Sequence, residues 1–465
     1  MFRSKAASYS IPLTFLVFAI VYSSPVIGET EPTTNAKDGG TLSLQAGLSH
    51  GYLPMDDNKN IYSRIQVKAD DVTTQDRAPL NLAVVIDRSG SMGGGRLKQA
   101  KRAAHKLVDR LSSQDRLAIV SYGSDVTVQS QSLPVKPENQ DQFHSAISAI
   151  HRNGSTFLSG GFEKAASLVS AQATDDSIDR VILLSDGRAN RGTRTANALG
   201  RLTESKLENG ISTTTMGIGL NYDENIMATM AEMGAGNHYF IEDEKKIAKM
   251  FGQEFESLAS VVARDAYLVL ELGKNVELLN VRGASHRRSK GNVVVDLGAF
   301  YANQHRDVLL DLAASSAGDG ARPIVDVNLH FDDVTGDEDR SVTHKVSLTG
   351  IGTDDADKLA EVRPSVMQRV EHFAYAESVK KATDAWDNGN RKKAEKILEQ
   401  QKERLDEAAE KSWLAESKVQ EKKRELDQKK SRIHRFGSSR STSGKRMKKK
   451  DAEDTLDLMH SGAAF

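Results

Sequence analysis

The chain has 465 residues, enough for two or three domains that each bury their own core. Its 63 Lys and Arg residues nearly balance 64 Asp and Glu residues, so no overall field directs it to nucleic acid or to a membrane. The absence of cysteine excludes disulfides, thiolate metal sites and a lipid-modified N-terminal cysteine. Aromatic residues make up only 6%, too few for a large base-stacking surface. Specific nucleic-acid recognition is therefore not expected, and function has to be sought in local motifs.

The first 28 residues have the pattern of a secretory signal peptide. A basic start precedes an apolar run from Ile11 to Tyr22, and small residues lead to Gly28, after which we expect cleavage. A retained membrane anchor is the alternative, but Pro12 and an interruption at residues 23–25 leave a short apolar run for a membrane span. The pattern predicts an exported protein, periplasmic or extracellular, with no transmembrane segment after cleavage.

Hydrophobic spacing then divides the chain into regions of different secondary structure. Residues 29–40 are polar and are interpreted as a flexible linker, whereas apolar and polar residues alternate over residues 41–78. That period of two predicts half-buried antiparallel strands. Residues 79–262 instead contain short continuous apolar runs, such as Leu82–Ile86 and Val181–Leu184, between amphipathic helical patterns. Such runs are typical of parallel strands covered on both faces, so we predict a doubly wound, Rossmann-like α/β domain with a mostly parallel sheet.

Alternation returns over residues 263–352, which predicts an antiparallel β-sandwich. Its own strands are too few, so we expect the strands of residues 41–78 to pair into it, with the α/β domain inserted between the two segments. Residues 363–430 are rich in Ala, Lys, Glu and Gln and are broken at Gly389, which predicts a helical hairpin.

The C-terminal residues 431–465 are predicted to be a disordered basic tail. Ten Lys and Arg residues and no acid lie between Lys429 and Lys450, with Ser and Gly among them. One interpretation is a solvated end, and the other is electrostatic attachment to an anionic surface such as lipid headgroups, cell-wall polymer or extracellular nucleic acid.

Oxygen-bearing side chains gather in a short motif directly after the apolar run that ends at Ile86. Asp87, Ser89 and Ser91 alternate there in a turn that contains Gly90. Oxygen ligands of this kind suit Mg²⁺, Mn²⁺ or Ca²⁺ rather than zinc. This turn alone is equally consistent with an ordinary strand-to-helix loop.

Two further residues strengthen the metal interpretation. Thr156 precedes a predicted helix, and Asp186 follows the next strongly apolar strand. Ligands of a doubly wound sheet bind beyond the carboxyl ends of its strands. Both residues are therefore expected beside Asp87.

Together these residues resemble the metal-ion-dependent adhesion site of von Willebrand factor type A domains, a D-x-S-x-S motif followed by a distant Thr and a distant Asp. The matching positions are Asp87, Ser89, Ser91, Thr156 and Asp186. The resemblance covers about residues 80–260 and includes the stretches 115–122, 210–212 and 217–219, which are similar to core strands of that family. The flanking segments resemble exported bacterial members in which a β-rich region and a short helical tail follow the domain.

The resemblance implies one divalent cation, Mg²⁺ or alternatively Mn²⁺ or Ca²⁺. It implies that the three hydroxyls bind the metal directly, that the two carboxylates act directly or through water, and that one open position receives an Asp or Glu of a partner protein. An intact fold with an empty site is the alternative. The implied function is an exported protein-binding module, for adhesion or scaffolding, in the cell envelope or outside the cell.

A metal-dependent hydrolase of phosphate or ester bonds is the alternative function. It would need a general base near the open metal position. The nearest acid, Glu163, falls on a helix where solvent exposure is the simpler account, so no catalytic residue is assigned and an enzyme is not expected.

Overall fold

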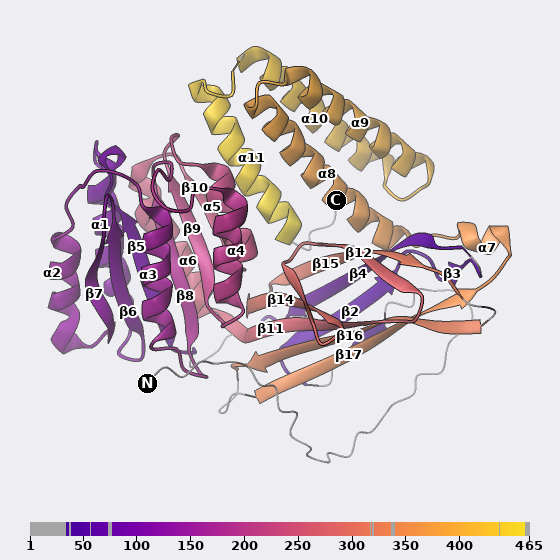
Figure 1. The fold of residues 1–465 in the computed structure, drawn as a ribbon, viewed down its shortest axis with the longest axis horizontal. Helices are drawn as coiled ribbons and strands as arrows, with labels where there is room; N and C mark the ends of the chain where they lie inside the picture. The colour runs from indigo at the N-terminus through magenta and orange to yellow at the C-terminus, as the bar shows by residue number, and fades with distance from the viewer. Residues whose placement is uncertain are drawn as a thin grey trace.

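Three groups of elements make up the computed structural model: an α/β domain, two antiparallel sheets beside it, and a set of C-terminal helices lying along both (Figure 1). The structure describes residues 34–36, 39–55, 57–72, 77–316, 318, 320–335, 340–436 and 438–460. The expected signal peptide, residues 1–28, lies outside the described residues. Of the expected flexible linker, Thr34–Ala36 form strand β1, which pairs with β2, so that expectation is wrong for these three residues.

The α/β domain is built on a six-stranded sheet with the order β10-β9-β8-β5-β6-β7. Its strands are β5 (Leu80–Asp87), β6 (Arg116–Tyr122), β7 (Val126–Pro134), β8 (Ile178–Ser185), β9 (Ser212–Ile218) and β10 (His238–Ile241). β6 and β7 pair antiparallel, and the other neighbours pair parallel. Every residue of β5 and β8 is buried, which explains why these strands are continuous apolar runs.

Helices cover both faces of this sheet. They are α1 (Arg96–Val108), α2 (Gln140–Ser148), α3 (Leu158–Ser170), α4 (Ala196–Leu207), α5 (Glu224–Met233) and α6 (Ile247–Ala259), with 3₁₀ turns η1 (Gly90–Met92), η2 (Pro137–Asn139) and η3 (Glu244–Lys246). α1, α2 and α6 contribute to one hydrophobic core, whereas α3, α4 and α5 contribute to the other. The doubly wound arrangement predicted from the sequence is confirmed, and it leaves the loops at the carboxyl edge free to form a site.

Two sheets form the sandwich, with strand orders β1-β2-β4-β15-β12 and β13-β14-β11-β16-β17-β3. Their neighbouring strands pair antiparallel except β17 and β3, which pair parallel. Before the α/β domain come β2 (Leu42–Leu48), β3 (Tyr52–Leu53) and β4 (Lys59–Ala69). After it come β11 (Val261–Leu272), β12 (Val276–Arg282), β13 (His286–Ser289), β14 (Asn292–Tyr301), β15 (His305–Ala314), β16 (Gly320–Asp333) and β17 (Arg340–Gly352). β4 pairs with β15 along ten residue pairs, and both segments share one core. The α/β domain is therefore inserted between two parts of the sandwich, in agreement with the predicted fold class.

The C-terminal region differs from the predicted hairpin and disordered tail. It consists of α7 (Ala356–Ala360), α8 (Pro364–Asp387), α9 (Arg391–Glu410), α10 (Glu416–Phe436) and α11 (Thr442–His460). The hairpin thus gains a third long helix, and most of the expected tail is helix α11, so the prediction of disorder is wrong for Thr442–His460.

The prediction of a disordered tail failed because composition does not reveal partners that are distant in sequence. Lys429 pairs with Asp451, and Lys448 donates a hydrogen bond of 2.8 Å to Asp387. Met447 and Leu456 are buried, so the helix also contributes apolar surface to the helical bundle. Lysines that appear to be a solvated charge run are thereby neutralised within the fold.

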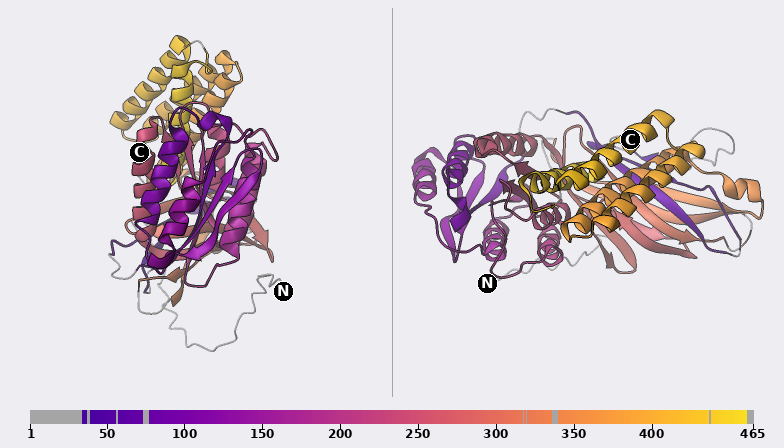
Figure 2. Two further views of the ribbon diagram at one scale, coloured as in Figure 1. Left: turned by 90° about the vertical axis from the view of Figure 1, so that its left-hand side faces the viewer. Right: turned by 90° about the horizontal axis from the view of Figure 1, so that it is seen from above.

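α11 connects the helical bundle to the α/β domain. It contacts α8 on one side and α5 and β10 on the other, and it runs along the boundary between the parts (Figure 2). None of the helices in the described part of the chain combines the length and apolar character that a membrane crossing requires.

Candidate metal site

Asp87, the last residue of β5, forms the base of the candidate site. Its side chain is completely buried and is held from both sides. The backbone N–H of Ser89 donates to Oδ1 at 2.8 Å, and the hydroxyl of Ser185 donates to Oδ2 at 2.9 Å. Tyr122 adds a longer contact of 3.4 Å to Oδ2. Asp87 is therefore fixed by the strands on both sides of β5, within the core rather than at an exposed loop edge.

The two serines lie in and just before the short turn η1. The Ser89 and Ser91 hydroxyl oxygens are 3.0 Å apart, and the Ser91 hydroxyl donates to Asp186 Oδ1 at 2.6 Å. Ser89 is buried whereas Ser91 is exposed, so the row of oxygen atoms leads from the protein interior to the surface. The η1 turn thus joins the carboxyl end of β5 to that of β8.

Thr156 reaches the site from the loop before α3. That loop is attached to the Asp87 turn, since Gly90 N–H donates to Gly154 O at 2.9 Å and Asn153 N–H donates to Arg88 O at 2.7 Å. Thr156 N–H also donates to Asn190 Oδ1 at 2.8 Å, in the loop that follows Asp186. The backbone N–H of Asn190 in turn donates to Thr156 O at 3.1 Å, so three loops far apart in sequence are held together by backbone and side-chain hydrogen bonds.

The hydroxyl groups converge beside Gly187. A Cβ atom placed on this glycine would lie 3.0 Å from Ser91 Oγ, 3.4 Å from Thr156 Oγ1 and 3.9 Å from Ser89 Oγ. One small volume is thus surrounded by all three hydroxyl oxygens, and glycine keeps it free of a side chain. The structure therefore brings together the five residues that the sequence singled out.

The donor set fits a cation such as Mg²⁺, Mn²⁺ or Ca²⁺, because it consists of oxygen atoms only. Across the described ranges, no three His, Cys, Asp or Glu side chains gather at a common metal-binding position, so the hydroxyls are needed here to complete a coordination sphere. Burial raises the pKa of Asp87 to about 6, and the charge of Asp186 adds to this against hydrogen bonds from Ser89 and Ser185. Burial also raises the pKa of Asp186. Two buried carboxylates this close are stabilised by added positive charge.

The sequence interpretation missed the residues that support the site. Arg96, at the start of α1, donates to Asp186 Oδ2 at 2.8 Å and to Ser91 O at 2.9 Å. Ser185 and Asn190 position Asp87 and Thr156. A supporting role for Ser185 could have been suspected from its place directly before Asp186. Nothing in the sequence indicates that Arg96 contacts a residue of another loop.

The comparisons with known proteins assign the domain. A family model described as the von Willebrand factor type A domain matches residues 81–253. These residues form a von Willebrand factor type A domain. Such domains commonly mediate protein–protein interaction.

The curated relatives of the chain are distant. An uncharacterized protein from Synechocystis sp. is 26% identical over 295 residues, 61% of this chain and 69% of that protein. The uncharacterized protein YfbK from Escherichia coli is 27% identical over 257 residues, 54% of this chain. The chain spans only 44% of the length of that E. coli protein.

Among solved structures, von Willebrand factor type A from Catenulispora acidiphila aligns with 92% of this chain and 99% of that one. The TM-score is 0.70 at 18% sequence identity, so the likeness is one of fold. Because the alignment extends far beyond residues 81–253, it includes elements outside the von Willebrand factor type A domain.

Arginines surround the site on its loops. In the loop segments 87–95, 149–157 and 186–195, the acidic residues are Asp87 and Asp186 themselves. The exposed arginines of these loops are Arg152, Arg188, Arg191 and Arg194. These arginines favour the approach of acidic groups. The exposed Asp125 of the neighbouring loop, which pairs with Arg88, reduces that positive charge.

Proposed function

We propose that the chain is an exported, metal-dependent protein-binding module for adhesion or scaffolding. One divalent cation, Mg²⁺ or else Mn²⁺ or Ca²⁺, is held by Asp87, Ser89, Ser91, Thr156 and Asp186, and it binds a carboxylate of a partner protein. The observation that carries this proposal is the convergence of three hydroxyl oxygens on one point beside Gly187, next to two buried carboxylates.

Each residue of the site has a distinct task. Asp87 and Asp186 supply negative charge from the sheet edge, while the neutral hydroxyls supply oxygen atoms without cancelling more of the cation's charge. A bound cation supplies residual positive charge toward solvent, where an incoming carboxylate forms a strong charge-assisted contact. The exposed side chain of Ser91 marks the side from which the partner approaches.

We propose binding rather than catalysis because of the residues around the site. The exposed side chains on its loops include four arginines, which remain protonated and therefore cannot act as a general base. His151 is also exposed on these loops, and in the described part of the chain no contact joins it to the five site residues. Glu163, the nearest acid in sequence, is exposed on α3. Export, to the periplasm or outside the cell, rests on the signal-like N-terminus alone.

Metal titration tests the proposal most directly. Calorimetric titration with Mg²⁺ and with Mn²⁺ should show one site in the wild type, and Thr156→Val should lower the affinity at least about tenfold by removing one oxygen ligand at constant shape. Thr156→Ser keeps the hydroxyl and should stay within about threefold of the wild type. Equal affinity of the valine variant and the wild type would rule out the assigned site.

A further inference from the structure

A charged pocket lies on the carboxyl edge of the same sheet, between the loops after β8 and β9 and helix α11. It has a volume of about 250 Å³. Its lining residues are Arg188, Leu220, Asn221, Tyr222, Glu224, Lys445, Lys448 and Lys449. We call it the α11 pocket. Four of these side chains are cationic and one is acidic, so the pocket as a whole favours an anion.

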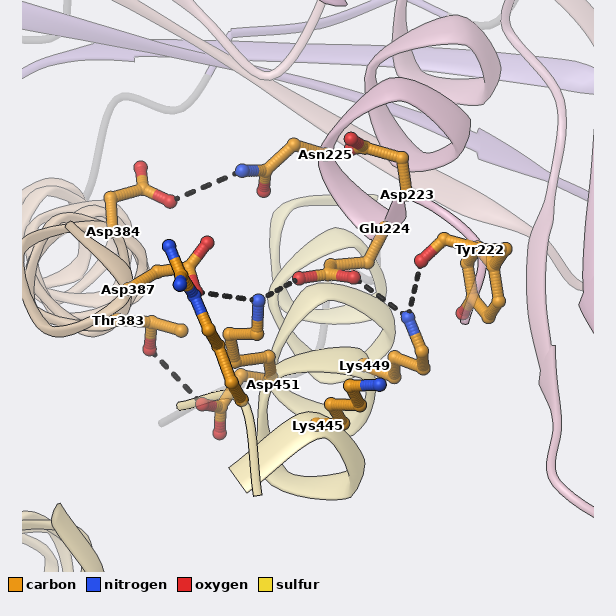
Figure 3. A network of polar contacts seen from close by, with 12 residues as sticks. Tyr222, Asp223, Glu224, Asn225, Thr383, Asp384, Asp387, Lys445, Lys449 and Asp451 are labelled. Carbon is orange, nitrogen blue, oxygen red and sulfur yellow. Dashed lines mark hydrogen bonds and ion pairs between the residues drawn. The ribbon is translucent and has the colours of Figure 1, made fainter. Parts of the chain in front are cut away.

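Two of the four cations are already neutralised within the fold. Lys448 contacts Glu224 Oε1 at 2.9 Å and Asp387 at 2.8 Å. Lys449 contacts Glu224 Oε2 at 2.7 Å (Figure 3). Both lysines are nearly inaccessible, with 5% and 1% of their surface exposed. They are structural charges that fix the wall of the pocket.

The other two cations remain available. Lys445 donates to the neutral amide of Asn221 at 2.9 Å and is half-buried, which leaves donors of its ammonium group free for a second contact. Arg188 is exposed, and within the described part of the chain it has no hydrogen-bond or ion-pair partner. An arginine and a lysine at the mouth of one pocket are suited to a carboxylate, which Arg binds through two parallel hydrogen bonds.

The wall that carries Lys445 is attached firmly. The Lys449 ammonium donates to Tyr222 O at 2.7 Å and lies 3.7 Å from the centre of the Tyr222 ring. Further along α11, Glu453 accepts a hydrogen bond from the backbone N–H of Phe240 at 3.1 Å. α11 is thereby fixed to both β10 and the loop before α5, so the pocket is a built feature of the surface.

Arg188 places the pocket next to the metal site, because it follows Asp186 by two residues and Gly187 lies between them. We propose that the α11 pocket binds a second carboxylate of the same partner segment whose first carboxylate binds the metal. This inference rests on the proposed function. The partner segment is then an acidic peptide with at least two nearby Asp or Glu residues, and α11 is part of the binding surface.

The test uses two synthetic peptides of six residues with blocked ends, one of six glutamates and one of a single glutamate among glutamines. Binding to the full mature chain is measured by fluorescence anisotropy in excess Mg²⁺. The wild type should bind hexaglutamate at least about tenfold more tightly than the single-glutamate peptide, since two charge-assisted contacts replace one. The double substitution Arg188→Ala, Lys445→Ala should lower the affinity for hexaglutamate at least about tenfold, and it should lower the affinity for the single-glutamate peptide by no more than about threefold, through the general attraction that the charge of Arg188 exerts.

Lys450→Ala is the matched control, because Lys450 is exposed on the same helix outside the pocket. If the double variant and the control bind hexaglutamate equally well, the α11 pocket is not the second site. Repeating the measurement with a chelator separates the two proposals. Loss on chelation without loss in the double variant supports the metal site and overturns the pocket, whereas the reverse result overturns the metal site as the first carboxylate position.

Discussion

Two sets of buried carboxylates lie at the carboxyl edge of the same sheet, and they are neutralised in different ways. Glu224 follows β9 and is surrounded by the ammonium groups of Lys448 and Lys449. Burial alone would raise the pKa of Glu224, but the charges and hydrogen bonds of these lysines outweigh burial and lower it to about 2. Asp87 ends β5 and accepts hydrogen bonds from neutral donors, and burial raises its pKa to about 6.

The difference indicates what each carboxylate is for. Glu224 has its counter-charges on the chain itself, from a helix more than two hundred residues away, so its role is to hold α11 in place. Asp87 and Asp186 share a single arginine, Arg96, which pairs with Asp186 at the partly exposed margin of the site. A cation from solution, as proposed above, would supply the positive charge that the chain itself does not place beside them.

The largest effect is expected where the counter-charge is part of the chain. Glu224→Gln leaves two buried ammonium groups without their anion, and removal of one partner of a buried ion pair costs about 3–5 kcal/mol. Amide hydrogen exchange should therefore show lost protection along α11. Glu242→Gln is the control, since its partner Arg446 lies on the same helix but at the surface, and protection should hardly change.

The same contact should respond to acid. Because the pKa of Glu224 is about 2 in the fold and its ordinary value is 4.5, its stabilisation is complete above pH 4.5 and is lost as the pH falls toward 2. The difference in unfolding free energy between the wild type and Glu224→Gln, measured in urea, should shrink over that range. A difference that stays constant from pH 5 to pH 2 would contradict the lysine–glutamate account.

The region around α11 also shows a limit of prediction from sequence. The runs of β5 and β8 revealed a parallel sheet because burial on both faces is visible in a short stretch of residues. The lysines of α11 look like a solvated run in any local window, because Glu224 and Asp387 are distant in sequence. Composition gives the number of charged residues but not the residues that pair with them, so the helix α11 was not predicted.

The site was more predictable than its surroundings. Asp87 and Asp186 each adjoin the end of a buried parallel strand, and the sheet itself places such ends along one edge. Thr156 was expected beside them from its place before a predicted helix, and the resemblance to von Willebrand factor type A domains implied its role as a ligand. Arg96 and Asn190 did not, because their roles depend on how the loops pack against one another.

A smaller effect, of opposite sign, is expected at Asp87. In the presence of a chelator, Asp87→Asn removes a buried charge without changing the side-chain shape, and we expect the variant to be about 1–2 kcal/mol more stable than the wild type. With Mg²⁺ at about a hundredfold its dissociation constant, the wild type should gain about 2.7 kcal/mol and the variant should gain nothing. Thermal and urea unfolding with and without Mg²⁺ measure both effects.

Asp115→Asn provides the contrast for that experiment. Asp115 is equally buried, but Arg77 donates to it at 2.7 Å and lies beside it as a counter-charge. The same substitution there should destabilise the protein whether or not Mg²⁺ is present. An Asp87→Asn variant that is destabilised in the chelator, or that still gains stability from Mg²⁺, would show that Asp87 is structural in the way Asp115 is.

The smallest effect tests Arg96, which places positive charge where the cation is proposed to act. Its guanidinium lies 2.8 Å from Asp186 Oδ2 and therefore both neutralises this carboxylate in the absence of metal and repels an arriving cation. Arg96→Gln should tighten Mg²⁺ binding about fivefold, because roughly 1 kcal/mol of repulsion at a solvated margin is removed. Arg194→Gln removes the same charge from an exposed position of the site loops, for which the structure shows no contact with Asp186, and should leave the affinity nearly unchanged. Weaker Mg²⁺ binding by Arg96→Gln would mean that Arg96 orients Asp186 for the metal. In that case the arginine, like the lysines around Glu224, would be a fixed structural partner rather than a replacement for the cation.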